Sequence, residues 1–507
     1  MLKLNISVRF STLLVGFLLI TFNSKQTLAA ETYDNLTLKQ AIEIALNNNA
    51  EKKISYQAAA IAESQYQEAL SARWPTLTLQ GSFQRRDEAP TFVFPSSSMP
   101  LGGIQPALQA AASLGAQAQA QQANLLAGNP PLDPATLAAI GAGAAAQVPS
   151  GISVPEQNVK LFNRDTTIAS LQLLYPLYTG GKINSYITQA GLGKEIAHEE
   201  MRRTTLQVIR DVKRYYYAAQ LTQNLTDTAH DTVNLLSVTR DLTKTIYEGG
   251  SATINKLDYL KTDLAVAYTK SVEADFSAKN KSALAALSNA MGVAWDSKIT
   301  LTDSMNIKPG SDPEVDALVR QASEFNPQVG MLRLAVKVAN AKIDEAKSGH
   351  LPQVAITADT THIQNSYDSG LTNDANRNSW TIGIGVSLPL FDGWRTSSQV
   401  STAKLQHAQM QEKQKLVEQG IATLVKNLFI EFDGARQQIA ISEHASLTAE
   451  ENRSLTSRAF EIGASKPQDV IEANILHAVI KGNLLRAQHD QLLKLAEIDY
   501  VLGSEAQ

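Results

Sequence analysis

One stretch of strict alternation constrains this chain more than any other feature. Between Trp380 and Leu390 the even positions are apolar, and the odd positions are small or polar, namely Thr381, Gly383, Gly385, Ser387 and Pro389. A period of two predicts a β-strand, which we place over residues 379–390. Because one face is apolar and begins with an aromatic while the other suits water, the stretch is typical of a transmembrane β-barrel strand.

The strand leads into a junction that occurs twice. The motif LPLFDGWR ends at Arg395 and the motif YPLYTGGK ends at Lys182, an offset of 395 minus 182, or 213. The same offset relates the motif FEIG, which ends at Gly463, to YEGG, which ends at Gly250. The chain therefore carries an internal duplication in which a strand enters a long helix that ends at a glycine turn.

A second repeated unit comes before each junction. A helix followed by proline and a strand occurs around Pro75 and again around Pro352, so we expect helices over 36–73 and 313–347. Each half then runs as short helix, strand, loop, strand, long helix, turn and long helix. The expected boundaries are 31–310 and 311–507 for the two repeats, 75–84, 166–177, 352–362 and 379–390 for the strands, 85–165 and 364–378 for the loops, and 247–256 and 460–472 for the helical tips.

The first half also carries an insert, over residues 87–160, that is rich in alanine, glutamine, glycine and proline. Such a composition buries little apolar area, so we predict a functional surface loop or a disordered segment there. An alanine-rich helix within 108–126 is the one regular element that we expect in it.

The first 30 residues have the pattern of a secretory signal peptide, since Lys3 and Arg9 come before an apolar run and alanines follow it. A retained membrane helix is the alternative, but that run is about a dozen residues long, against roughly 20 for a spanning helix. After it the chain has no long apolar run. A membrane-spanning chain without such helices needs a closed β-barrel, because lipid satisfies no backbone hydrogen bonds.

Charge and residue types exclude several classes of function. The formal net charge is −4 and no basic patch with interleaved aromatics occurs, so no nucleic-acid partner is expected. The chain has no cysteine, which excludes disulfides and thiolate metal sites. Its histidines form no paired zinc pattern, and no nucleophile elbow or complete phosphate loop is present. We therefore predict no enzyme, no metal site and no cofactor.

The helices and strands together indicate an oligomer. The helical stretch from Lys182 to Tyr247 would extend on the order of 95 Å, and such a length suggests a coiled-coil assembly. Four strands cannot close a barrel; two chains would give eight strands and three would give twelve, and a conducting pore favours three. The predicted fold is mainly α with transmembrane β: four strands per chain in a trimeric, 12-stranded barrel, joined to a long α-helical barrel, with internal duplication.

Several motifs occur together in this order: the opening LTLKQAIEIALNNN, the paired junctions, the paired tips YEGGSAT and FEIGASK, and the paired endings ALSNAMG and EIDYVLG. In these the chain resembles the TolC family of outer-membrane efflux and secretion channels, over essentially all of it apart from the insert at 87–160. The resemblance implies a homotrimer whose barrel lies in outer-membrane lipid and whose helical tunnel crosses the periplasm. It also implies two partners: a periplasmic adaptor (membrane fusion) protein, and an inner-membrane transporter of ABC, RND or MFS type.

An acidic pair follows the second tip. Asp469 and Glu472 are three residues apart and share a helix face, so a trimer would stack them as two rings that repel one another and attract cations. The resemblance implies that this Asp-Val-x-acid pattern forms the gate at the tunnel aperture. The alternative is that acidic residues in a first helical turn simply compensate the helix dipole.

Six residues are expected to make tip contacts or to dock the adaptor: Gly249, Gly250, Lys256, Phe460, Gly463 and Ser465. Family members that lock a closed tip have an acidic residue and an arginine where this chain has Lys256 and Ser465. Lys256 is therefore a candidate partner for Asp469 or Glu472. Phe460 stands where some relatives have a tyrosine, so it cannot make that hydrogen bond.

Two further groups mark the membrane end of the fold. The strand–helix junctions are assigned to Pro176, Gly180, Gly181, Pro389 and Gly393. Aromatic residues at the strand ends form an interfacial girdle or, alternatively, core packing: Trp74, Tyr175, Tyr178, Phe391 and Trp394.

The expected function is that of a passive exit duct of a tripartite efflux pump or a type I secretion system, with an acidic periplasmic gate opened by the adaptor and transporter. The alternative is a structural protein, either a periplasmic coiled-coil spacer or an adhesin stalk anchored in the outer membrane. A solid anchor would fill the polar strand face with larger side chains than Gly383 and Gly385. The sequence does not identify the cargo.

Overall fold

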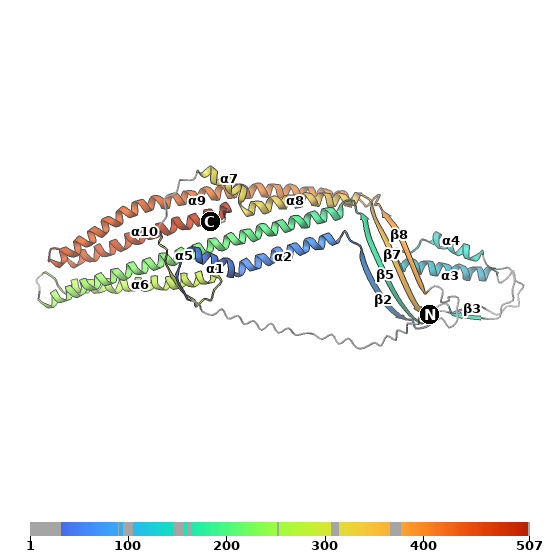
Figure 1. The fold of residues 1–507 in the computed structure, drawn as a ribbon, viewed down its shortest axis with the longest axis horizontal. Coiled ribbons are helices and arrows are strands. Elements are labelled where there is room, and N and C mark those ends of the chain that lie inside the picture. Colours follow the sequence, from blue (N-terminus) through green and yellow to red (C-terminus); the bar gives the residue numbers. More distant parts are fainter. Residues whose placement is uncertain are drawn as a thin grey trace, which may run out of the picture. The chain divides into compact units, whose positions relative to one another are not determined.

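A computed structural model describes residues 32–89, 91–94, 105–146, 148, 157–160, 164–250, 253–305, 314–365 and 377–504. The predicted signal peptide lies outside these residues, as does most of the loop expected over 364–378. The described chain is mainly helical with a small amount of sheet, as predicted (Figure 1). No helix in these ranges combines the length and the apolar character that crossing a membrane requires.

Four strands form one antiparallel sheet in the order β2-β5-β7-β8. Their bounds are Thr76–Arg85 for β2, Asp165–Tyr178 for β5, Gln353–Asn365 for β7 and Asn378–Ser387 for β8. The sheet thus joins strands from both halves of the duplication. β8 ends at Ser387 and not at Leu390 as expected, since Pro389 has no N–H to donate to a ladder.

The two faces of the sheet differ as the alternation predicts. Val386 lies opposite Val354 and Ile384 opposite Ile356, so apolar side chains of neighbouring strands share one face. On that face of β8, Trp380 is 74% exposed and Ile384 is 69% exposed. A single chain therefore leaves uncovered an apolar sheet face that a soluble protein would bury.

Two very long helices follow the sheet, and each turns back into a shorter one. α5 (Lys182–Glu248) and α9 (Arg395–Glu461) both contain 67 residues. α6 (Lys256–Met291) and α10 (Pro467–Leu502) both contain 36 residues. These equal lengths confirm the internal duplication.

The short helices at the start of each half are interrupted, which corrects the prediction of single helices over 36–73 and 313–347. The first half has α1 (Leu38–Asn48) and α2 (Ala50–Ser71), and the second has α7 (Val315–Phe325) and α8 (Pro327–Lys347).

Each interruption is at an asparagine that binds the end of a distant helix. Asn49 donates from Nδ2 to the carbonyl of Ala290 at 2.8 Å, and Asn326 donates to the carbonyl of Val501 at 2.7 Å. Asn326 and Asn49 are 326 minus 49, or 277, positions apart, which is the offset between Pro352 and Pro75. The interruptions therefore belong to the duplicated design, where an amide side chain caps carbonyls that the ends of α6 and α10 leave free.

A small parallel sheet, which periodicity did not indicate, ties the beginning of the described chain to the end of the first half. β1 (Thr32–Leu36) pairs with β6 (Lys298–Leu301). The fully buried Tyr216 donates from its hydroxyl to the carbonyl of Leu36 at 2.8 Å. Strands this short carry too few residues for an alternating pattern, so only the tertiary contacts define them.

The insert at 87–160 is more ordered than predicted. β3 (Thr91–Phe94) pairs antiparallel with β4 (Gln157–Lys160), and between them are α3 (Gln105–Leu126) and α4 (Pro134–Ala145). The two helices approach closely, because a Cβ at Gly141 would lie 2.2 Å from Oγ of Ser113. Small side chains make this close approach possible, a use of glycine that the composition argument did not consider. The helix expected within 108–126 is therefore correct but too short.

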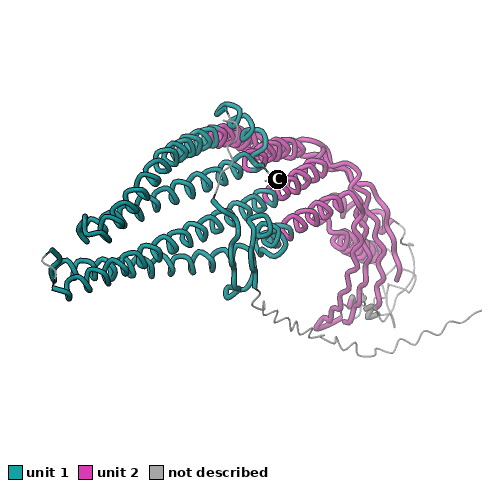
Figure 2. The backbone as a smooth tube through the Cα atoms, turned by 60° about the vertical axis from the view of Figure 1, so that its left-hand side comes forward, with its two compact units in different colours: residues 1–56, 201–327, 419–507 teal, residues 57–200, 328–418 magenta. Residues whose placement is uncertain are grey.

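Figure 2 divides the chain into two compact units. Unit 1 contains residues 1–56, 201–327 and 419–507, and unit 2 contains residues 57–200 and 328–418. Each unit takes segments from both repeats. The helical hairpin tips belong to unit 1, whereas the four-stranded sheet and its junctions belong to unit 2.

Candidate functional site

The two helical hairpins of unit 1 meet in an apolar cluster at their tips, here called the tip seam. Its buried members are Phe460 at the end of α9, Val470 in α10 and Ile254 just before α6, which are 5%, 1% and 9% exposed. Leu242 and Ile246 of α5 pack against them. Phe460, singled out because it cannot make a tyrosine hydrogen bond, is thus the largest side chain of the tip seam.

Glycine makes both tip turns possible. Gly250 and Gly463 have φ angles of +80° and +74°, a region that other residues rarely adopt. The amide of Gly250 donates to the carbonyl of Tyr247 at 3.1 Å, and that of Gly463 donates to the carbonyl of Phe460 at 2.9 Å. These bonds end the long helices and turn the chain back, as the repeated motif predicts.

The acidic pair is exposed at the beginning of α10. Asp469 accepts a hydrogen bond from the backbone amide of Lys466 at 2.9 Å, and Glu472 accepts one from Nε2 of Gln468 at 2.9 Å. Asp469 therefore caps its own helix, as the helix-start alternative expects. Both carboxylates are solvent-exposed in the chain, so the capping role leaves them available to a further partner.

Lys256 begins α6, and in the described part of the chain no ion pair joins it to Asp469 or Glu472. The polar contact between the hairpins is made instead by Lys261, whose Nζ donates to Oε1 of Gln468 at 3.0 Å. Sequence reasoning missed this pair, because the contact depends on how the two hairpins are aligned and no local pattern marks it. Ser465 makes only long contacts, including one of 3.5 Å to the carbonyl of Thr456.

The duplicated strand–helix junctions have the same backbone shape. Gly180 and Gly181 have φ angles of +63° and +87°, and at the matching positions Gly393 and Trp394 have +69° and +66°. A Cβ at Gly180 would lie 2.7 Å from Cβ of Leu351, which excludes larger residues there. Trp394 adopts a left-handed conformation that disfavours a bulky side chain, so the second junction holds a strained tryptophan.

The aromatic residues at the strand ends are exposed in the chain. Trp74, Phe391 and Trp394 are 70%, 76% and 72% exposed, and Phe391 meets Trp394 edge to face with ring centroids 6.3 Å apart. Tyr175 and Tyr178 are 37% and 47% exposed. Packing within one chain therefore does not account for them. Pro176 lies within β5, beside an irregularity in its register with β7.

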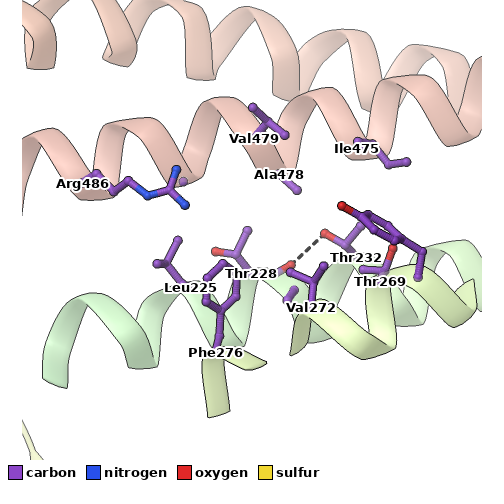
Figure 3. A pocket seen from close by; sticks show the side chains of 13 residues that line it. Leu225, Thr228, Thr232, Thr269, Val272, Phe276, Ile475, Ala478, Val479 and Arg486 are labelled. Atoms are coloured by element: carbon purple, nitrogen blue, oxygen red, sulfur yellow. Dashed lines mark hydrogen bonds between the residues drawn. The ribbon is translucent and has the colours of Figure 1, made fainter. Parts of the chain in front are cut away.

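A cavity of about 260 Å³ lies between α5, α6 and α10 (Figure 3). Its wall is mostly apolar, with Leu225, Val272, Phe276 and Ile475 among the lining residues. The hydroxyls of Thr228, Thr232 and Thr269 donate to carbonyls one turn back in their own helices at 2.7 to 2.8 Å. No nucleophile–base pair lines this cavity, and in the described ranges no three metal-binding side chains gather.

One buried histidine lies in the second hairpin. His477 is 7% exposed, and its Nε2 is 2.9 Å from Oε2 of Glu450, which also pairs with Arg453 at 2.6 Å. Burial lowers the pKa of His477 below its usual 6.5, Arg453 and Lys481 add to that effect, and Glu450 opposes it. His477 is therefore neutral at pH 7.

The sequence profile of the outer membrane efflux protein family matches residues 103–293 and 318–504. The chain belongs to this family. The match covers both long hairpins and both strand–helix junctions, so it includes the two copies of the repeat. Members of the outer membrane efflux protein family are channels and not enzymes, and membership places this chain in the outer membrane with its long helices in the periplasm.

Individual relatives agree with the family assignment. The chain is 26% identical over 209 residues to the outer membrane protein TolC of Salmonella enteritidis, over 40% of this chain and 43% of that protein. It is 23% identical over 351 residues to the alkaline protease secretion protein AprF of Pseudomonas aeruginosa, over 67% of this chain and 70% of that protein. The match to TolC thus spans about two-fifths of the relative's length.

Solved structures share the fold. The Campylobacter jejuni CmeC outer membrane channel superposes with a TM-score of 0.69 at 12% identity, over 92% of this chain and 85% of that chain. CusC, described with its transmembrane channel formation, superposes with a TM-score of 0.68 at 14% identity, over 93% of both chains. The mainly helical, outer-membrane fold class predicted from the sequence is confirmed by these matches.

Proposed function

We propose that this chain assembles as a homotrimer into a passive exit duct through the outer membrane. The observation that carries the proposal is the four-stranded sheet, which has one apolar and one polar face and two unpaired edges, β2 and β8. An open edge in lipid leaves backbone groups without partners, so the β8 edge of one copy must pair with the β2 edge of the next.

Three copies give a barrel with a water-filled interior. Two copies would close eight strands, and side chains fill the interior of a barrel that small. The polar face of β8 carries Gly383, Gly385 and Ser387, which leave room inside a twelve-stranded barrel. The exposed apolar face then contacts lipid, and Trp74, Tyr175, Tyr178, Phe391 and Trp394 form the interfacial girdle.

The long helices continue the duct into the periplasm. A helix of 67 residues extends about 100 Å at 1.5 Å per residue, enough for a tunnel that projects far from the membrane. The domain plan is that of a signal peptide over 1–30, repeats over 31–310 and 311–507, and periplasmic tips at 247–256 and 460–472. The tips dock a periplasmic adaptor and an inner-membrane transporter of ABC, RND or MFS type, which supplies the energy.

The gate lies at the tips. In a trimer the exposed carboxylates of Asp469 and Glu472 would form acidic rings that attract cations and repel one another. The tip seam of Phe460, Val470 and Ile254 holds the α9–α10 hairpin against the α5–α6 hairpin. Opening the duct at this end therefore requires that the tip seam separate.

The test combines oligomeric mass with single-channel conductance in a planar bilayer. The wild type is compared with Asp469→Ala/Glu472→Ala and with the control Glu451→Ala/Glu461→Ala, which removes two exposed carboxylates of α9. We expect a trimer with small, cation-selective conductance that rises and loses selectivity only in the first variant. Large conductance that neither variant changes would retain the duct and reject the gate. A trimer that never conducts would reject the duct and favour a structural spacer.

A further inference from the structure

A second cavity, of about 590 Å³, lies in unit 2 beside the strand–helix junctions. α8 and α9 form its walls, and the beginnings of α5 and β7 complete it. The lining includes three cationic side chains, Lys182, Lys342 and Arg395, and one carboxylate, Glu345. Most of the other lining residues are polar or small. This cavity is therefore unlike the apolar cavity of unit 1, and its chemistry is that of a basic site.

The positive charge of this basic cavity is only partly compensated. Glu345 accepts a hydrogen bond from Nε2 of Gln189 at 2.7 Å, and Nε of Arg395 lies 3.8 Å from Oδ2 of Asp392. Among the residues that the structure describes, no carboxylate pairs with Lys182 or Lys342 within 4.0 Å. Two ammonium groups thus face the cavity without a counter-charge.

Helix stability does not explain these cations. Lys182 and Arg395 are the first residues of α5 and α9, where the positive end of the helix dipole disfavours a cation. Neither helix has an acidic residue in its first turn. Both positions are equivalent in the duplication, at the end of the motifs YPLYTGGK and LPLFDGWR. The chain therefore places a cation twice at a point where local stability favours an anion.

The register of the sheet shows on which side the cavity opens. Gln353, the first residue of β7, lines the cavity and lies opposite Ser387 of β8. Ser387 is on the polar face with Gly385 and Gly383, because side chains alternate along a strand. Gln353 therefore belongs to the face turned away from Trp380 and Ile384. The cavity opens on the side that faces the lumen in the proposed duct.

We propose that the basic cavity binds oxyanions, the carboxylate or phosphate groups of anionic molecules that pass through the lumen. The inference rests on the proposed duct, and it adds a preference for anionic cargo. Ammonium and guanidinium groups make strong, charge-assisted hydrogen bonds to such oxygens. The amides of Gln399 and Gln406 line the same cavity and supply further donors.

The phosphate of a membrane lipid has the same chemistry, but its position favours the lumen less. A lipid headgroup would approach from the apolar side of the sheet, where Trp380, Ile382 and Val386 are exposed. The cavity lies beside the polar face. The experiment therefore supplies the anion in water and varies the charge of the lipid separately.

The test measures block of single-channel current by inorganic pyrophosphate in a bilayer of zwitterionic phosphatidylcholine. The variant Lys182→Gln/Lys342→Gln removes the two unpaired ammonium groups. The control Lys337→Gln/Lys404→Gln removes two exposed lysines of α8 and α9 that do not line the cavity. We expect pyrophosphate to block the wild type and the control alike, and to block the first variant with roughly tenfold weaker affinity, as loss of one charge-assisted contact predicts.

The outcomes separate this inference from the proposed function. Channels that conduct but show equal block in all three proteins would reject the basic cavity as an anion site while leaving the duct in place. Protein that gives no current would reject the duct itself. If binding of pyrophosphate is absent and the variant differs only in vesicles of anionic phosphatidylglycerol, the cavity serves a lipid headgroup, and the lumenal site is wrong.

Discussion

Removing the aromatic ring of Phe460 tests whether the tip seam holds the two hairpins together. Phe460 is 5% exposed and packs against Ile254 and Val470, with Leu242 and Ile246 beside them. Phe→Ala in a packed core costs about 3–5 kcal/mol, and a cluster at the end of a hairpin falls at the lower end of that range. About 3 kcal/mol changes an equilibrium on the order of a hundredfold. Phe460→Ala should therefore shift the tips strongly toward the separated state.

The assay is single-channel recording of open probability, with vancomycin entry into cells as a second readout. Ile462→Ala is the matched control, because Ile462 is two residues away and 81% exposed. Circular dichroism and oligomeric mass show whether Phe460→Ala still folds, and since Phe460 lies in the last turn of α9, the damage should be local. An open probability of Phe460→Ala equal to that of Ile462→Ala and the wild type, in a folded trimer, would refute the reasoning.

Three further predictions concern stability and are read from thermal unfolding. Gly482→Ala should stabilise the protein by about 0.5–1 kcal/mol, because a Cβ there meets Leu225 at an ordinary 3.4 Å and alanine favours the interior of α10; a lower midpoint would contradict this. Asn326→Ala should cost about 1–3 kcal/mol, since it leaves the buried carbonyl of Val501 without its donor, and Asn326→Asp should restore little, as it offers no amide. Because the folded chain lowers the pKa of His477, the unfolded chain binds the proton first, so stability should fall as pH drops through 6.5; His477→Gln should flatten that slope, and an unchanged slope would reject the assignment.

The long-period features of the fold could be predicted because the sequence states them twice. The alternation from Trp380 onward identifies β8, and the offset of 213 places Gly180 and Gly393 at equivalent bends, which the structure shows with φ angles of +63° and +69°. The glycine turns at Gly250 and Gly463 follow from the same repeat. Each of these depends on local backbone requirements, which composition and spacing express directly.

Features that depend on distant contacts could not be predicted. Asn49 and Asn326 interrupt helices because they cap carbonyls more than 170 residues away, at Ala290 and Val501. The cavity with Lys182 and Lys342 forms only when α5 and α8 come together. In such cases a residue's role is set by its neighbours in space, and the sequence around it carries no signal.

The central claim is that the polar face of the sheet lines a water-filled duct, and the absence of cysteine from the chain makes this directly measurable. Ser387→Cys places one thiol on the polar face, and Val386→Cys places one on the apolar face of the same strand. Each is treated with a charged methanethiosulfonate reagent during single-channel recording. The account predicts that the current falls in Ser387→Cys and stays constant in Val386→Cys. Current that is unchanged in Ser387→Cys, although mass spectrometry shows the thiol modified, would contradict it.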